Sequence, residues 1–214
     1  MKRALARAIN AQPHELGGAL AAFATAFAMF SAYAILRPIR ETMGITSGVQ
    51  TLPALFWGTF IGMLLVQPVY GWLTSRFRRS SFLPWVYLFF VCNILGFHAW
   101  FNAQEDHTWI ARAYFIWVSI FVLFVVAVFW SLMADVFSRE QAGRLFGFVA
   151  AGLSTGGLFG PWLAPKLMTI TQQVPVEGAS AVDVGNYLSA FVISGVMSLV
   201  AAVLVTVVRP PARD

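Results

Sequence analysis

Apolar residues fill this chain in six long runs, which are separated by short polar or charged stretches. We place the runs at about residues 16–36, 53–73, 82–101, 112–133, 144–165 and 187–208. Each is about 20 residues long, the length that a helix needs to cross the hydrocarbon core of a bilayer. Because a helix satisfies its backbone hydrogen bonds within one segment, the pattern predicts an all-α membrane protein with six transmembrane helices.

The runs divide the chain into a short N-terminal segment, one membrane domain and a short tail. We assign residues 1–15 to a cytoplasmic segment, 16–208 to the six-helix domain, and 209–214 to a cytoplasmic tail or the start of a central linker. The longest connection, at about 166–186, is too short for an ATP-hydrolysing domain, and no Gly-Lys-Ser/Thr phosphate loop occurs. Primary pumping by this chain alone is therefore excluded.

Composition supports a membrane location. Hydrophobic residues make up 59% of the chain and charged residues 11%, whereas soluble domains are about 25% charged. The net charge of +5 comes from basic residues between apolar runs, which indicates membrane orientation and not nucleic-acid binding. The single cysteine, Cys92, lies inside an apolar run, so the sequence carries no disulfide framework or metal-ligand cluster. We expect no cofactor and no metal.

The basic residues predict the orientation of the chain. With the N-terminus inside, ten lie on the inner side: Lys2, Arg3, Arg7, Arg76, Arg78, Arg79, Arg139, Arg144, Arg209 and Arg213. Four lie on the outer side: Arg37, Arg40, Arg112 and Lys166. Because Lys and Arg concentrate on the cytoplasmic side, we expect both termini in the cytoplasm of a cell with a bacterial-type inner membrane.

Charged residues gather where the first apolar run ends, in the stretch YAILRPIRETMGI. If the helix continues past Pro38, then Tyr33, Arg37, Arg40 and Glu41 share one face, and the missing proline N–H leaves one carbonyl of the preceding turn free. Two interpretations remain open: the arginines extend to the lipid headgroups, or they face a substrate path within the bundle. In the second, both arginines donate to an anionic substrate, while Glu41 holds Arg37 or carries a coupling proton.

The loop after the second run, GWLTSRFRRSSFLP, resembles the loop signature of the major facilitator superfamily. Gly71, Leu73, Arg76 and Arg79 match that pattern, whereas Ser75 replaces its Asp and Arg78 replaces its second Gly. With the Asp missing, Arg76 needs another carboxylate, and Asp135 at the inner end of the fourth run is available. We expect a cytoplasmic charge network that gates the protein, made of Arg76, Arg79, Asp135, Arg139 and Arg144.

The fifth run contains GLSTGGLFGPWLAP, which is similar to the antiporter signature of the same superfamily. Gly152, Gly156 and Gly160 recur every four residues, followed by Pro161, and predict a groove that lets another helix approach closely. The same stretch matches G-x-S-x-G at Ser154, as in rhomboid-type intramembrane proteases. A catalytic serine needs a base, and the sixth run contains no histidine. We therefore expect no enzyme.

The segment ILRPIRETM also resembles the nucleotide-exchange (ATP/ADP translocase) branch of the superfamily. In that branch a Leu-Arg-x-x-Lys-Asp segment ends the first span; Leu36 and Arg37 match it, and Arg40-Glu41 keeps both charge signs. The likeness continues through FWSLMADVFSREQAGRLFGFVAAG. It implies a half-transporter with a 3+3 inverted repeat that works by alternating access on a small anionic solute such as a nucleotide.

Such a transporter needs a second six-helix half, in the same chain or as another chain, with the substrate site between the halves. The sequence predicts a secondary transporter, or its N-terminal half, with the lipid bilayer and that second half as partners. The alternative is a membrane subunit, or the truncated remnant of a transporter, that does not itself transport.

Overall fold

The computed structural model describes residues 11–12, 14–77, 79–103, 108–169 and 188–207. Within these residues the chain forms helices and no strands, which confirms the all-α prediction. The elements are α2 (Leu16–Thr46), η1 (Val49–Thr51), α3 (Leu52–Arg76), α4 (Arg79–Ala103), α5 (Thr108–Val136), α6 (Arg139–Thr169) and α7 (Leu188–Val207).

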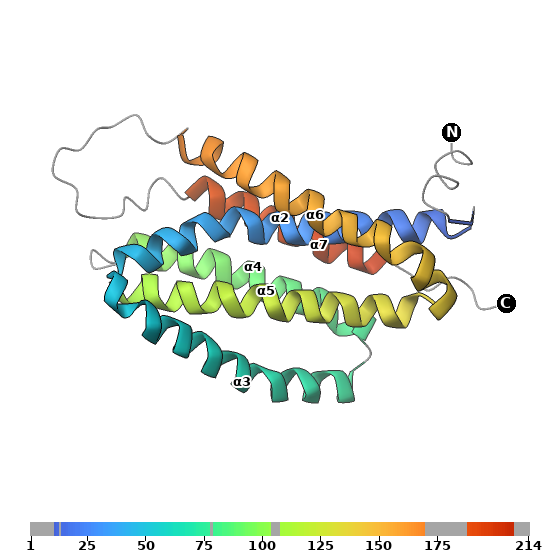
Figure 1. The fold of residues 1–214 in the computed structure, drawn as a ribbon, viewed down its shortest axis with the longest axis horizontal. Helices are drawn as coiled ribbons and strands as arrows, with labels where there is room; N and C mark the ends of the chain where they lie inside the picture. The colour runs from blue at the N-terminus through green and yellow to red at the C-terminus, as the bar shows by residue number, and fades with distance from the viewer. Residues whose placement is uncertain (1–10, 13, 78, 104–107, 170–187, 208–214) are drawn as a thin grey trace.

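The long helices lie side by side and run in alternate directions along one axis (Figure 1). The start of α2 and the end of α7 therefore lie at the same end of the bundle, together with the connection from α5 to α6. The turn between α2 and α3 lies at the opposite end. For clarity we call these the α2-start end and the α2-finish end.

Four helices among the described residues are long and apolar enough to cross a membrane: Leu16–Ile45, Val49–Leu73, Thr108–Val136 and Arg139–Lys166. Two shorter apolar stretches, Trp85–Phe101 and Ala190–Leu204, lie in α4 and α7. The described residues thus agree with a helical membrane protein, with four helices of spanning length where the sequence predicted six.

The first helix is longer than the sequence prediction. We expected its apolar run to end at residue 36, but α2 continues through Pro38 to Thr46. A proline removes one backbone donor without stopping the helix when the surrounding turns remain bonded. The helix ends instead at Ser47, whose hydroxyl donates to the Met43 carbonyl at 2.8 Å, and Gly48 follows with φ +98°. Only glycine adopts that backbone conformation without strain.

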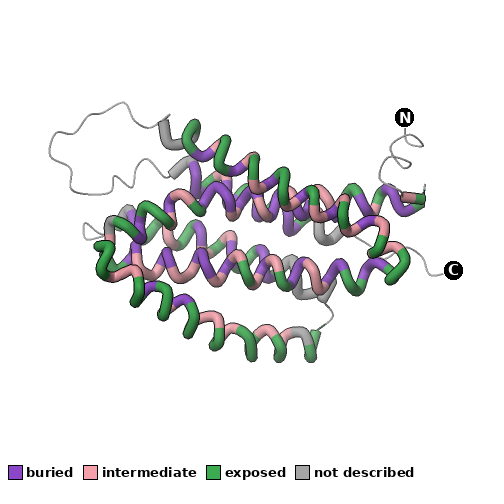
Figure 2. The backbone as a smooth tube through the Cα atoms, viewed as in Figure 1, coloured by how far each residue is buried: buried purple, intermediate pink, exposed green. Residues whose placement is uncertain are grey.

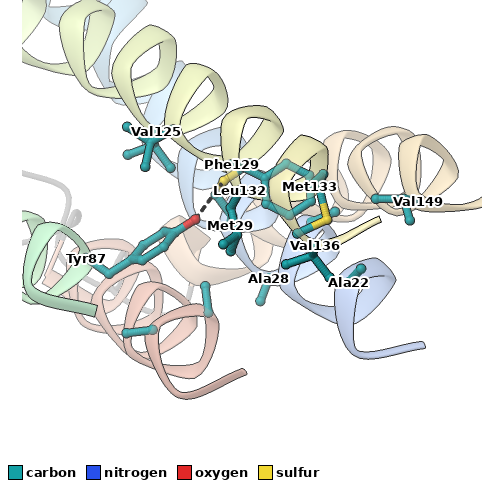
Figure 3. Close-up of a cluster of buried hydrophobic side chains, with 14 of the residues drawn as sticks. Ala22, Ala28, Met29, Tyr87, Val125, Phe129, Leu132, Met133, Val136 and Val149 are labelled. Carbon is teal, nitrogen blue, oxygen red and sulfur yellow. Dashed lines mark hydrogen bonds between the residues drawn. The ribbon is translucent and has the colours of Figure 1, made fainter. Parts of the chain in front are cut away.

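Buried side chains form two clusters along the bundle. The cluster near the α2-start end joins α2, α4, α5, α6 and α7, and Figure 3 shows its centre, where the Tyr87 hydroxyl donates to Met29 Sδ at 3.2 Å. The cluster near the α2-finish end joins α2, α4, α5 and α7 around Ile39 and Tyr114. Because α2, α4, α5 and α7 contribute to both clusters, these four helices hold the bundle together along its length.

Helix α3 lies apart from the other helices and packs mainly on α5 (Figure 1). Most of its surface is exposed, as Figure 2 shows. Its exposed large apolar side chains are Phe56, Trp57, Phe60, Ile61, Leu64, Leu65, Val69 and Trp72. An apolar helix exposed in this way needs lipid or another protein surface around it.

The closest helix contact joins α2 and α6. Gly152, Gly156 and Gly160 of α6 all lie against α2. A Cβ added to Gly156 would lie 2.6 Å from the Phe27 carbonyl oxygen, so only glycine permits this separation. Pro161 follows inside the same helix and is exposed. The structure thus places the glycine groove predicted from the sequence against the first helix.

Candidate functional site

The charged stretch near the α2-finish end forms one connected group. Arg40 Nη1 donates to Glu41 Oε1 at 2.8 Å, and Arg37 Nε lies 3.9 Å from the same oxygen. Continuation of α2 through Pro38 makes this possible, because it keeps the three residues within about one turn of helix. Glu41 therefore contacts both arginines, whereas the sequence predicted a contact with Arg37 alone.

The two arginines differ in their surroundings. The side chain of Arg37 is 62% exposed and that of Arg40 is 15% exposed. The Arg40 guanidinium lies over the ring of Phe115, with Cζ 4.2 Å from the ring centroid. Its Nε is buried and has no hydrogen-bond acceptor among the described residues. Arg40 is thus a fixed, partly shielded cation with an unused donor, which is a suitable binding group for an anion.

The Phe115 ring can lie under Arg40 because the α2 residue next to it, Gly44, has no side chain. The nearest carbon of the Phe115 ring would lie 2.8 Å from a Cβ added to Gly44. Phe56 of α3 packs edge-on against the same ring, with centroids 5.7 Å apart. The aromatic platform under Arg40 is therefore built from three helices, and neither Gly44 nor Phe115 was found by sequence reasoning.

Tyr33 lies one turn before Arg37 and is half-buried. Its ring packs against Phe30 with centroids 5.5 Å apart. The hydrogen bonds among the described residues do not join Tyr33 to either arginine. Tyr33 thus lies nearer the middle of α2 than the two arginines do, and its role in the predicted site stays a prediction.

A second charged group lies at the α2-start end. The carboxylate of Glu15 accepts two hydrogen bonds from Arg144, at 3.0 and 3.2 Å. It also accepts one from the Gln141 amide at 3.0 Å and one from the Gln12 backbone N–H at 2.8 Å. We call this group the Glu15 clamp, and it joins the start of α2 to the first turns of α6.

The Glu15 side chain is only 2% exposed. Burial by itself raises the pKa of the carboxyl group, but the hydrogen bonds from the Gln12 N–H, Arg144 and Gln141 outweigh it and hold the pKa below its ordinary value. Glu15 is therefore charged at neutral pH. From the sequence, Glu15 was predicted only to lie in a cytoplasmic segment. Its place directly before an apolar helix, where a carboxylate is favoured, was the signal for a structural role.

The other residues of the predicted gating network lie near the same end. Arg76, Asp135 and Arg139 are exposed, and the side chain of Arg79 lies outside the described residues. Arg144 of this network pairs with Glu15. The predicted latch between Arg76 and Asp135 stays a prediction.

Ser154, the centre of the G-x-S-x-G match, is exposed on α6. Its hydroxyl donates to the Ala150 carbonyl of its own helix at 3.4 Å. The two glycines that flank it in the motif, Gly152 and Gly156, are both packed against α2. The motif is thus accounted for by helix packing.

Comparison with known proteins decides the family. A sequence profile of the Major Facilitator Superfamily matches residues 18–214. The chain belongs to this superfamily. Its members are transporters and not enzymes, so membership supports transport and leaves the protease alternative without support. No solved structure matches the chain significantly.

Two curated relatives are named as nucleotide carriers. ADP,ATP carrier protein 2 of Chlamydia pneumoniae is 25% identical over 171 residues, covering 64% of this chain and 31% of the carrier. ADP,ATP carrier protein 2 of Chlamydia trachomatis serovar D is 23% identical over 172 residues, with the same shares covered. The chain thus spans about a third of the length of the curated relatives that it matches.

Proposed function

We propose that this superfamily chain is a six-span half of a secondary transporter that moves a small anionic solute by alternating access. The alternate course of the helices supports six crossings, because α4 and α7 run beside helices that are long enough to span a bilayer (Figure 1). In this arrangement both termini lie in the cytoplasm, and the α2-finish end lies outside, as the distribution of basic residues favours.

The pattern of helix contacts supports a 3+3 inverted repeat. If α2, α3 and α4 correspond to α5, α6 and α7, the α2–α6 contact corresponds to α5–α3, and α2–α7 corresponds to α5–α4. All four contacts are present. Exchanging the two three-helix repeats leaves the α2–α5 and α4–α7 pairs unchanged, and both of these contacts are present as well. Glycines lie in both members of the first pair, since Gly58 and Gly62 of α3 face α5.

Arg40 carries the proposed substrate site. Its guanidinium is oriented by Phe115 and Glu41 while its buried Nε lacks an acceptor among the described residues. Arg37 adds an exposed positive charge beside it, and Tyr33 extends the site inward. Guanidinium groups bind phosphate and carboxylate oxygens through paired hydrogen bonds, which favours an anionic substrate.

A nucleotide is the substrate that these features favour. Both relatives are named for ADP and ATP, and the phosphates of a nucleotide suit arginine donors. A second six-helix half would complete the site and would cover apolar faces such as that of α3. The cytoplasmic charges of Arg76, Arg79, Asp135, Arg139 and Arg144 would gate the opposite end of the path.

Uptake of labelled ATP and ADP by cells that express the protein in its native context tests the proposal. We expect Arg40→Ala to abolish uptake and Arg40→Lys to keep part of it, because lysine retains the charge but loses the paired geometry. The two variants must match the wild type in abundance and thermal unfolding.

Normal uptake by Arg40→Ala would indicate that Arg40 is a lipid anchor, and the proposed substrate site would be wrong. If the wild-type protein neither binds nor transports any nucleotide or other small anion in its native context, the chain is a membrane subunit that does not transport.

A further inference from the structure

Arg112 of α5 repeats the environment of Arg40. Its guanidinium lies over an aromatic ring, with Cζ 5.0 Å from the centroid of Trp109. Its Nε is buried and lacks a hydrogen-bond acceptor among the residues that the structure describes. Among the described residues, the buried side-chain atoms without a partner are two serine hydroxyls and the Nε atoms of these two arginines. A buried charged donor without an acceptor is unfavourable, so both sites favour an acceptor that a ligand brings.

Phe115 places the two arginines on the same side of the bundle. Arg40 lies over its ring, and Arg112 precedes it by one turn of α5, which is about 4.5 Å along the helix axis. Helix α5 begins at the α2-finish end (Figure 1), and Arg112 precedes Phe115 in that helix, so its backbone lies nearer this end than that of the residue under Arg40. The rings that hold the two guanidinium groups, Phe115 and Trp109, are six residues apart in α5, which is about 9 Å along the helix axis. Two guanidinium groups bound at opposite ends of one diphosphate can have a separation of this order.

The position of Arg112 in its helix argues for a role in binding. It lies within the apolar stretch Thr108–Val136, which is long enough to cross a membrane. Arginine in such a stretch is costly unless it faces a cavity, a partner or a ligand. Its ring partner, Trp109, is 71% exposed, so the stacked pair also resembles an interfacial anchor. An anchor would leave Nε in contact with water or lipid oxygens, whereas this Nε is buried.

We propose that Arg112 is a second phosphate-binding residue, which acts with Arg40 on two neighbouring phosphates of one substrate. Arg40 holds one phosphate, and Arg112 holds the next one toward the α2-finish end. The site then discriminates nucleoside diphosphates and triphosphates from monophosphates. This inference rests on the proposed function, to which it adds a residue that distinguishes nucleotides by their number of phosphate groups.

Competition binding with AMP, ADP and ATP tests this role, using the protein in native membranes. We expect Arg112→Ala to weaken ADP and ATP binding about tenfold, as the loss of a charge-assisted contact does. AMP binding should change by less than about twofold, since AMP has no second phosphate for Arg112 to hold. Arg112→Lys should restore part of the preference for ADP over AMP.

Lys166→Ala is the matched control. Lys166 also lies over a tryptophan ring at the α2-finish end, with Nζ 3.4 Å from the Trp162 centroid, and its side chain is exposed. We expect this variant to bind all three nucleotides as the wild type does. If both variants lower binding equally, the effect is one of general surface charge and the proposal is wrong.

Chemical modification gives a second measurement that does not depend on a substitution. Phenylglyoxal, which reacts with arginine, should label Arg112 in the free protein, and ADP should protect Arg112 more strongly than AMP does. Equal protection of Arg112 by AMP and ADP would show that Arg112 does not bind the second phosphate. Equal losses of AMP and ADP binding in Arg112→Ala would show the same.

The outcomes also separate this inference from the proposed function. If Arg40→Ala loses all nucleotide binding while Arg112→Ala binds like the wild type, only the inference fails. If the wild-type protein binds no nucleotide at all, the proposed function fails and the inference fails with it.

Discussion

At the scale of single residues, burial separates two kinds of charged group on α2. Glu15 is buried with its carboxylate oxygens accepting hydrogen bonds from three residues. Arg40 is partly buried with one donor unused among the described residues. A fully bonded charge stabilises the fold, whereas an incompletely bonded one is available to a ligand. These surroundings give Glu15 a structural role and support the binding role that we propose for Arg40.

The Glu15 clamp should contribute measurably to stability. Arg144→Ala leaves the buried Glu15 carboxylate without its cationic partner, and we expect a loss of about 3 kcal/mol in the free energy of unfolding. Chemical unfolding in detergent measures it. Arg139→Ala is the control, because Arg139 begins the same helix but is exposed, and it should change the stability by less than about 0.5 kcal/mol. Equal losses of unfolding free energy in Arg144→Ala and Arg139→Ala would show that the Glu15 clamp does not contribute to stability.

The same clamp predicts a dependence on pH. The pKa of Glu15 is lower in the folded protein than its ordinary value of 4.5, so protonation favours unfolding. The stabilisation is fully present above pH 4.5 and is lost as the pH falls through the folded-state pKa. We expect the wild type to exceed Glu15→Gln in stability at neutral pH, with the difference narrowing in acid. A difference that is constant with pH would contradict this account.

At the scale of elements, the contact between α2 and α6 depends on the glycines of α6. Gly156→Ala places a methyl group against the backbone of α2, and we expect it to lower the thermal unfolding temperature and the activity together. Gly147→Ala is the control in the same helix, since a Cβ at Gly147 would contact nothing within 4 Å. It should be neutral or slightly stabilising.

Ser154→Ala distinguishes packing from catalysis in the same segment. We expect it to be mild, because Ser154 is exposed and its hydroxyl bonds only weakly to its own helix. An inactive Ser154→Ala protein with unchanged unfolding temperature would instead return the serine to a catalytic role.

At the scale of the whole molecule, the number of crossings and the orientation can be tested by labelling single cysteines. In a Cys92→Ser background, we expect Ser47→Cys and Ala103→Cys to react with an impermeant reagent from outside. Ser138→Cys, between α5 and α6, should react only from the cytoplasmic side. Labelling of position 103 from the inside would show that α4 does not cross, and the six-span arrangement would be wrong.

Much of this molecule follows from local sequence. The lengths of the apolar runs predicted the helices, because a membrane segment must bond its own backbone and span a fixed thickness. The four-residue spacing of Gly152, Gly156 and Gly160 predicted a close helix contact, since residues at that spacing share one face. The charged stretch at Arg37, Arg40 and Glu41 was visible for the same reason.

The tertiary structure alone decided which groups meet. Glu15 and Arg144 are 129 residues apart, and no local spacing relates them. The ring under Arg40 comes from α5, and Gly44 admits it for a reason that only packing shows. The sequence marks Arg112 only as an outer basic residue, whereas the structure shows that its Nε is buried, on the helix whose Phe115 lies under Arg40. Sequence periodicity determines the face of a helix on which a residue lies, but the partner on the neighbouring helix depends on how the helices pack.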